Sequence, residues 1–408
     1  MEQKVISLQY INIIYLLIGF PIISLIGIFN LDIPHYYITY PFKCLSLIVC
    51  LSIIYFRFDE LKNTFTNQYK FVYLFFALYL VSIFIDTCLY KNVYKKSHSY
   101  YFFAFVCNAV IPTLGVFLTD VFKLSFKNIL KYIFYPLLFF GFVNFIFFDF
   151  SLGYSHRSSG VSLMYPNFYG QVGVSLALVS FYYLFKSNNV RLQNILYIAG
   201  VFLGLWIVCA SGTKNAFLGL IISFSYMCLS IKPSIKKKIF IFTYSIVILL
   251  FFKSLDLSLF HRSESMLSYT VQNNSVGERI SLYSTVLAQI FEHPIFGSSL
   301  FINDKNSFLY SYHAHNLFLE SWMSMGLVGP ILLVMILIVP FKFIFTIKND
   351  SYLWVKFLFI QYFVQSLFSK SLHTSLEFWV LTALLITLYN KIKNEHKNMV
   401  ILSTHGRK

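Results

Sequence analysis

Long stretches of apolar residues, separated by short polar segments, make up most of this 408-residue chain. A helix needs about 20 mostly apolar residues to cross the roughly 30 Å hydrocarbon core of a bilayer, and windows of that length recur about twelve times. They lie at residues 9–30, 36–56, 70–90, 99–121, 129–150, 166–186, 193–211, 214–231, 238–254, 321–346, 351–369 and 374–390. The pattern therefore predicts an all-α, polytopic integral membrane protein with about twelve transmembrane helices.

Composition supports the same class. Hydrophobic residues account for 58% of the chain and charged residues for only 12%, which is too little polar surface for a soluble protein of this length. The first apolar window is longer than the core of a signal peptide, and no A-x-A cleavage site follows it. We therefore expect this window to be retained as a helix.

The basic residues indicate how the chain is oriented. Twenty of the 32 Lys and Arg residues fall in segments that are cytoplasmic if the N-terminus is cytoplasmic, and the cluster Lys91, Lys95 and Lys96 is the main exception. The positive-inside rule then predicts a single transmembrane domain, residues 1–408, with both termini in the cytoplasm. The net charge of +16 is explained by this topology and by contact with anionic membrane lipids, so nucleic-acid binding is not needed to account for it.

One predicted outward segment, residues 255–313 between the ninth and tenth spans, is much longer than the others. It contains an S-x-x-E capping box at Ser275 and Glu278, followed by apolar residues at helical spacing and then by Pro294 and Gly297. The apolar positions are Ile280, Tyr283, Leu287, Ile290 and Phe291. This pattern predicts an amphipathic helix that lies on the outer membrane surface or on the other helices.

Three cations stand beside helix-start signals on the predicted outer face. Arg157 precedes the sixth span, Lys214 begins the eighth, and Arg279 lies at the start of the loop helix. Helix N-termini with free N–H groups and an added cation bind anions, and Arg matches the two-pronged geometry of phosphate. Three such positions on one face indicate a single large anion, although each cation alone is more simply explained as a headgroup contact.

The segment "SYHAHNLFLESWMSMGLVGP", residues 311–330, places His313, His315 and Asn316 directly before an apolar run. Polar groups are costly at the mouth of a transmembrane helix, so their presence there favours a function. A solvated loop histidine or a helix cap is the simpler explanation for any one of them alone.

Four segments follow one another along the second half of the chain: Arg157 with "SSG" and "YPNFYGQ", then "SGTKNA", then "GERISLYSTVLAQIFEHPIFGSS", then "HAHNLFLESWMSMGLVGP". In this order, and on the predicted sides of the membrane, they resemble the O-antigen polymerase and ligase superfamily. The resemblance covers roughly residues 150–335, together with the helix count and the long late loop. The residues before it match only in hydropathy.

The resemblance implies a GT-C-like fold and a metal-independent glycosyltransferase that needs no cofactor. The donor would be a glycan on undecaprenyl diphosphate, in a bacterial inner membrane with the active site facing the periplasm. The chain contains no D-x-D, no G-x-x-x-x-G-K-[ST] and no G-x-G-x-x-G motif, so no nucleotide-sugar or ATP site is indicated.

Roles for individual residues follow from the resemblance and from the chemistry. Displacing a lipid diphosphate leaves negative charge, which Arg157, Lys214 and Arg279 would stabilise. His315 aligns with the histidine of the family's H-N motif and would act as the general base on the acceptor hydroxyl. The residues expected to bind substrate are His313, Asn316, Glu320, Asn167 and Tyr312. Lys214 departs from the family, which often has Arg at this position, so its role is less secure.

Three functions remain open at this stage. A polymerase would transfer the growing glycan to the repeat unit on a second undecaprenyl diphosphate, and "R-x-x-G" followed by "YPN", with "GLVG" after "HN", favours it. An O-antigen ligase would transfer the same glycan to lipid A-core. A polysaccharide or lipid-linked oligosaccharide transporter is the alternative of another class, against which the chain shows no internal repeat. Whether a chain-length regulator binds is left open.

Overall fold

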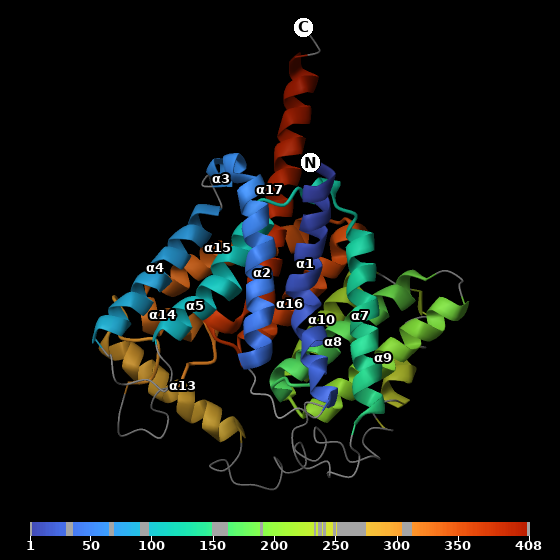
Figure 1. Cartoon of the computed structure of the whole chain (residues 1–408), viewed down its shortest axis with the longest axis horizontal. Coiled ribbons are helices and arrows are strands. Elements are labelled where there is room, and N and C mark those ends of the chain that lie inside the picture. Colours follow the sequence, from blue (N-terminus) through green and yellow to red (C-terminus); the bar gives the residue numbers. More distant parts are fainter. Residues whose placement is uncertain are drawn as a thin grey trace.

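All regular elements in the described part of the chain are helices (Figure 1). This computed structural model describes every residue except 1, 30–35, 65–68, 90–97, 149–161, 188–190, 232–233, 236–238, 240–241, 248–249, 251–274, 304–311 and 406–408. The predicted all-α fold is confirmed.

Among the described residues, ten helices have 18 or more residues: α1 Glu2–Ser24, α2 Tyr36–Phe56, α4 Tyr69–Leu89, α7 Phe126–Ile146, α8 Pro166–Lys186, α9 Arg191–Ser211, α10 Lys214–Ile231, α13 Ser275–Glu292, α15 Val328–Thr346 and α17 Leu376–His405. Shorter helices are α3 Phe58–Thr64, α5 His98–Phe105, α6 Ile111–Phe117, α14 Leu317–Met325 and α16 Leu353–Ser366. A π-helical turn, Val106–Val110, joins α5 to α6, and a 3₁₀ turn, Leu372–Thr374, precedes α17.

Nine helical segments in the described ranges are long and apolar enough to cross a membrane, which confirms the class of protein. They coincide with the first eight predicted spans and with the second part of the tenth. The ninth predicted span, 238–254, lies largely outside the described residues.

The tenth predicted span, 321–346, is not one helix. The chain forms α14 and α15 instead, and the break falls at Gly326, whose φ of +63° lies in the left-handed region. The carbonyl of Ile295 approaches this glycine so closely that a Cβ there would collide with it. Because apolarity continues through the break, hydropathy alone could not reveal it.

The last two predicted spans also differ in length from the helices observed. The span 351–369 contains α16, which has 14 residues, whereas the span 374–390 begins the 30-residue α17. The helix continues past residue 390 because the polar residues that follow, such as Lys391 and Glu395, are good helix formers although they are not apolar.

The amphipathic helix in the segment 255–313 is α13, and its buried face agrees with the predicted one only in part, at Ile290 and Tyr283. Leu282, Val286 and Ile290 pack into a cluster with three residues from outside the helix: Ile302, Ala314 and Met323. Ile280 and Phe291 were expected on this face, but they are 58% and 71% exposed. Helix α13 therefore packs against α14 through a stripe rotated away from the one inferred from spacing.

Helix α8 is the most buried of the nine candidate spans, since 83% of its apolar window lies inside the protein. It packs closely on α9, where a Cβ at Gly204 would collide with the backbone of Ala177. Small residues at such crossings let two helix backbones approach each other. This packing fixes the N-terminal end of α8, which forms one wall of the site described below.

Both chain termini lie at the same end of the bundle, and α13 lies at the opposite end (Figure 1). This arrangement agrees with a topology that places the two termini on one side of the membrane. The cytoplasmic location of that side stays a prediction.

Candidate active site

His315 lies just before α14 in a backbone conformation that few residues adopt. Its φ is +51°, in the left-handed region that costs a residue other than glycine roughly 1–2 kcal/mol. The next residue, Asn316, caps the helix, because its Oδ1 accepts hydrogen bonds from the N–H groups of Phe318 and Leu319 at 2.9 and 3.1 Å. Its Nδ2 donates to the carbonyl of Leu367 at 3.0 Å. Asn316 thereby fixes the start of α14 and the position of His315.

The imidazole of His315 lies within electrostatic range of the guanidinium of Arg279 on α13. Burial, and to a smaller extent the positive charge of Arg279, lower the pKa of His315 from 6.5 to about 4. Nδ1 of His315 and Nη1 of Arg279 are both buried, and neither has a hydrogen-bond partner among the described residues. Buried polar atoms are rarely left unpaired in proteins, so these two mark a place for a polar or anionic ligand.

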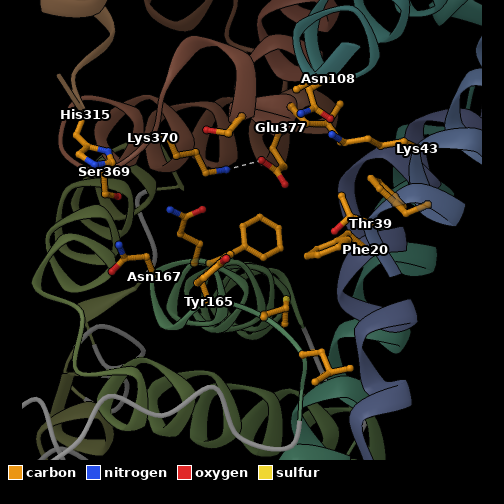
Figure 2. A pocket seen from close by; sticks show the side chains of 18 of the residues that line it. Phe20, Thr39, Lys43, Asn108, Tyr165, Asn167, His315, Ser369, Lys370 and Glu377 are labelled. Atoms are coloured by element: carbon orange, nitrogen blue, oxygen red, sulfur yellow. Dashed lines mark hydrogen bonds and ion pairs between the residues drawn. The ribbon is translucent and has the colours of Figure 1, made fainter. Parts of the chain in front are cut away.

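A cavity of about 390 Å³ lies beside His315 (Figure 2). Its polar lining consists of Thr39, Lys43, Asn108, Asn167, Gln171, His315, Ser369, Lys370, Thr374 and Glu377. Its aromatic lining consists of Phe20, Phe42, Tyr100, Tyr165 and Phe168. Aromatic faces together with amides and hydroxyls are the groups that bind sugar rings and their hydroxyls, and the volume is in the range of about 300–1,000 Å³ usual for small-ligand sites.

The lining comes from helices that are far apart in sequence. Helix α2 contributes Lys43, the first turn of α8 contributes Asn167, and the segment between α16 and α17 contributes Ser369 and Lys370. Pro166 begins α8 because its fixed φ suits a first helical position, and this places Asn167 at the cavity wall.

Lys370 and Glu377 form a buried ion pair at the cavity wall. Nζ of Lys370 donates to Oε2 of Glu377 at 2.5 Å, and the two side chains are only 8% and 5% exposed. The ammonium also lies 5.0 Å from the ring centre of Phe168 and 5.2 Å from that of Tyr362. From the sequence, Glu377 had no obvious partner, because Lys370 lies outside the predicted spans.

Two of the sequence-predicted site residues line this cavity, namely His315 and Asn167. Arg279 is close to His315 without being part of the lining, and Arg157 lies outside the described residues. Lys214 is the first residue of α10 and is not part of the lining. The next residue, Asn215, contacts the cavity wall, because its Nδ2 donates to Oγ of Ser369 at 2.5 Å. The roles predicted for these residues stay predictions.

The other predicted substrate contacts lie behind the cavity wall. Glu320 is fully buried; its carboxylate accepts hydrogen bonds from the hydroxyl of Tyr79 at 2.9 Å and from the N–H of Leu372 at 3.1 Å. The ring of His313 packs against Phe301, with 4.4 Å between the ring centres. Tyr312 is 46% exposed, and the amide of Asn316 is engaged in capping.

His313, Glu320 and His373 form a cluster, partly exposed at His313, whose potential ligand atoms lie within 4.8 Å of one another, so it could hold a metal ion. Nδ1 of His373 is 3.9 Å from Oε1 of Glu320, which is too long for a hydrogen bond. The carboxylate is already satisfied by Tyr79 and Leu372. The cluster is therefore explained as an anchor between α14 and the turn before α17.

Sequence reasoning missed Lys43 and Lys370 as site residues. Lys43 carried a usable signal, because it is a cation inside the predicted span 36–56, and ionisable residues within membrane spans are usually functional. Lys370 carried no such signal, since lysines between spans are common. Only the packing of α16 and α17 against α8 brings it to the cavity.

The fold and the site together define a polytopic, all-α membrane protein with a cavity of mixed aromatic and polar lining beside a histidine that precedes a helix. Residues 199–334 match the family model described as O-Antigen ligase, which confirms the resemblance to the O-antigen polymerase and ligase superfamily. This region contains Lys214, Arg279 and His315. No curated protein matches the chain.

Proposed function

We propose that this protein is an O-antigen polymerase of the bacterial inner membrane. It would transfer a glycan from undecaprenyl diphosphate to a sugar hydroxyl on the repeat unit of a second undecaprenyl diphosphate. The observation that supports this most directly is the position of His315, the histidine of the H-N motif, at a cavity lined by aromatic rings, amides and hydroxyls and within electrostatic range of Arg279. The family match over residues 199–334 supports an enzyme that acts on lipid-linked polysaccharide.

In the proposed reaction the acceptor hydroxyl attacks the anomeric carbon of the donor glycan. The new bond joins the acceptor oxygen to this carbon, and the bond from the carbon to the diphosphate oxygen breaks. The proton of the hydroxyl passes to His315, and undecaprenyl diphosphate leaves with the electron pair. The activated lipid supplies the driving force, so the proposal includes neither a metal ion nor a cofactor.

The lowered pKa of His315 has two consequences for this role. The imidazole is neutral at pH 7 and therefore able to accept a proton, but it is a weaker base than an exposed histidine. A diphosphate bound near Arg279 would offset the positive charge that lowers this pKa. Donor binding would thereby raise the basicity of His315 when it is needed.

Other residues would bind the diphosphate and the sugars of the substrate. Arg279, Arg157 and Lys214 would stabilise the departing diphosphate, and Asn167 would contact sugar hydroxyls. Gln171 joins Asn167 in this role, because its buried Oε1 has no hydrogen-bond partner among the described residues and the residue lines the cavity. Direct substrate contacts by His313, Asn316, Glu320 and Tyr312 would require these side chains to move.

An O-antigen ligase is the second candidate, and the description of the matched family model favours it. The donor and the proposed base would be the same, and only the acceptor would differ. We favour the polymerase on the motifs "R-x-x-G" with "YPN" and "GLVG" after "HN".

Deleting the gene and complementing it with wild type or His315→Ala tests the proposal, with lipopolysaccharide separated on a gel. A polymerase predicts loss of the ladder with a single repeat still attached to core in the His315→Ala strain. Complete loss of attached O-antigen, with lipid-linked polymer accumulating, would identify a ligase. The control is His293→Ala, an exposed histidine after α13, which should keep the wild-type ladder. A wild-type ladder from His315→Ala would eliminate the proposed base.

A further inference from the structure

Three large apolar side chains project from the end of α13 and from the turn that follows it. They belong to Phe291, Ile295 and Phe296, which are 71%, 61% and 89% exposed, and together they are called the apolar tip. The buried stripe of α13, which packs against α14, includes none of them. Single exposed apolar residues are common, but a cluster of large ones marks a surface that another molecule covers.

The apolar tip lies beside the start of a membrane-spanning helix. The N–H of Leu327 donates to the carbonyl of Pro294 at 3.0 Å, and the N–H of Ser298 donates to the carbonyl of Met323 at 2.8 Å. Helix α15 begins at the next residue, Val328, and is one of the candidate membrane spans. These bonds hold the turn at the end of the bundle opposite the chain termini, where one end of α13 lies beside α14 (Figure 1).

An exposed apolar stripe on α15 starts at this turn. Its members recur every three or four residues, so they share one face of the helix. In a membrane-spanning helix such a face contacts the acyl chains of the lipids. The apolar tip therefore continues a lipid-facing surface. The members of the stripe, each 38–49% exposed, are Leu327, Val328, Ile331, Val334, Met335 and Ile338.

We propose that the apolar tip inserts into the leaflet on the α13 side of the bilayer and anchors the C-terminal end of α13 to the membrane. Lipid is the partner that fits, because the lipid-facing stripe of α15 reaches the tip without a break. Glu292 and His293, which are exposed within the same turn, limit the insertion to the boundary between headgroups and acyl chains.

The anchor sets the height of α13 relative to the membrane. Arg279 lies on the same helix, twelve residues or about 18 Å along the axis before Phe291. One end of α13 therefore rests on lipid, while the other carries the cation within electrostatic range of His315. This inference depends on the membrane class of the protein and on its exposed surface, so it holds whatever ladder His315→Ala produces.

Fluorescence quenching on the purified, full-length protein in lipid nanodiscs tests the insertion. Phe296→Trp places a reporter at the apolar tip, and its added fluorescence is measured against the wild type. Phospholipids brominated on their acyl chains should quench this fluorescence, whereas iodide in the water should not. Phe84→Trp, at a 68% exposed position on α4, is the reference for contact with lipid.

Two results of this experiment would contradict the insertion. Quenching by iodide but not by brominated lipid would show that the tip faces water. Shielding from both quenchers would show that protein covers it, such as a second copy of the chain, and the number of copies in each nanodisc identifies that case.

Amide hydrogen exchange in nanodiscs tests the anchoring of α13. Phe291→Ser/Phe296→Ser removes two exposed rings that contribute little to packing within the protein, so the fold should be kept. Exchange along α13 should become about 10-fold faster or more, because the helix loses its hold on the lipid. Phe345→Ser is the control, since this 73% exposed residue lies at the other end of α15 and should leave the exchange of α13 unchanged. Wild-type exchange along α13 in the double variant would overturn the anchor.

Discussion

His315 combines two local features that proteins rarely keep without a use. Its backbone lies in the left-handed region, and its Nδ1 is buried without a partner among the described residues. Both features raise the free energy of the folded state, and the cap formed by Asn316 holds them in place. Such strain clusters at functional sites, and it supports the role proposed for His315.

The pH dependence of transfer should reveal the environment of His315. Because only the neutral imidazole accepts a proton, kcat/KM measured with a lipid-linked donor should fall with decreasing pH near pH 4 and not near pH 6.5. Arg279→Gln should move this acidic limb upward, since it removes one of the two causes of the lowered pKa. Burial is the larger cause and remains, so the limb should stay below pH 6.5.

The same shift affects stability. The pKa of His315 is lower in the folded state, so the unfolded chain binds more protons between pH 6.5 and pH 4, and His315's contribution to stability is lost as pH falls through this window. For the kcat/KM profile, an acidic limb near pH 6.5 in the wild type that Arg279→Gln does not move would contradict the buried environment described for His315.

The break between α14 and α15 contacts the segment that follows α13. The turn after α13 packs into it: the N–H of Leu327 and the Nε1–H of Trp322 both donate to the carbonyl of Pro294 at 3.0 Å. This turn ends the helix that carries Arg279, whereas α14 follows directly on His315. The break therefore fixes Arg279 relative to His315.

Gly326→Ala should disturb this junction. A side chain at a φ of +63° costs roughly 1–2 kcal/mol, and the collision with the carbonyl of Ile295 adds to that. We expect the free energy of unfolding in detergent to fall by about 2 kcal/mol or more and the transfer rate to fall as Arg279 shifts. Leu327→Ala, at a residue 46% exposed, is the control and should change stability by less than about 0.5 kcal/mol. Wild-type stability in Gly326→Ala would show that the break tolerates a side chain.

Across the whole molecule, the ion pair of Lys370 and Glu377 joins the start of α17 to the segment that follows α16. Removing one partner of a buried pair typically costs about 3–5 kcal/mol, because the other charge remains buried. We therefore expect Glu377→Gln to lower the midpoint of thermal unfolding strongly. The double variant Lys370→Met/Glu377→Leu should restore much of the loss, since no charge is then left unpaired. A double variant less stable than Glu377→Gln would contradict this account.

The sequence alone determined the class of protein and most of the membrane helices, and it singled out His315 as the candidate base. Apolar length is a local property, so eight spans from residues 9–30 to 214–231 could be placed from hydropathy, and the H-N motif marked His315. The division of the tenth span and the buried face of α13 depended on contacts with Ile295 and with α14, which no local pattern encodes.

Only the tertiary structure decided which side chains meet at the cavity. Lys43, Asn167, His315 and Lys370 lie on four segments spread over more than three hundred positions, and each reaches the cavity through the rotation and tilt of its own helix. These angles are set by side-chain packing between helices, such as the close crossing of α8 and α9, and not by the hydropathy of any one helix.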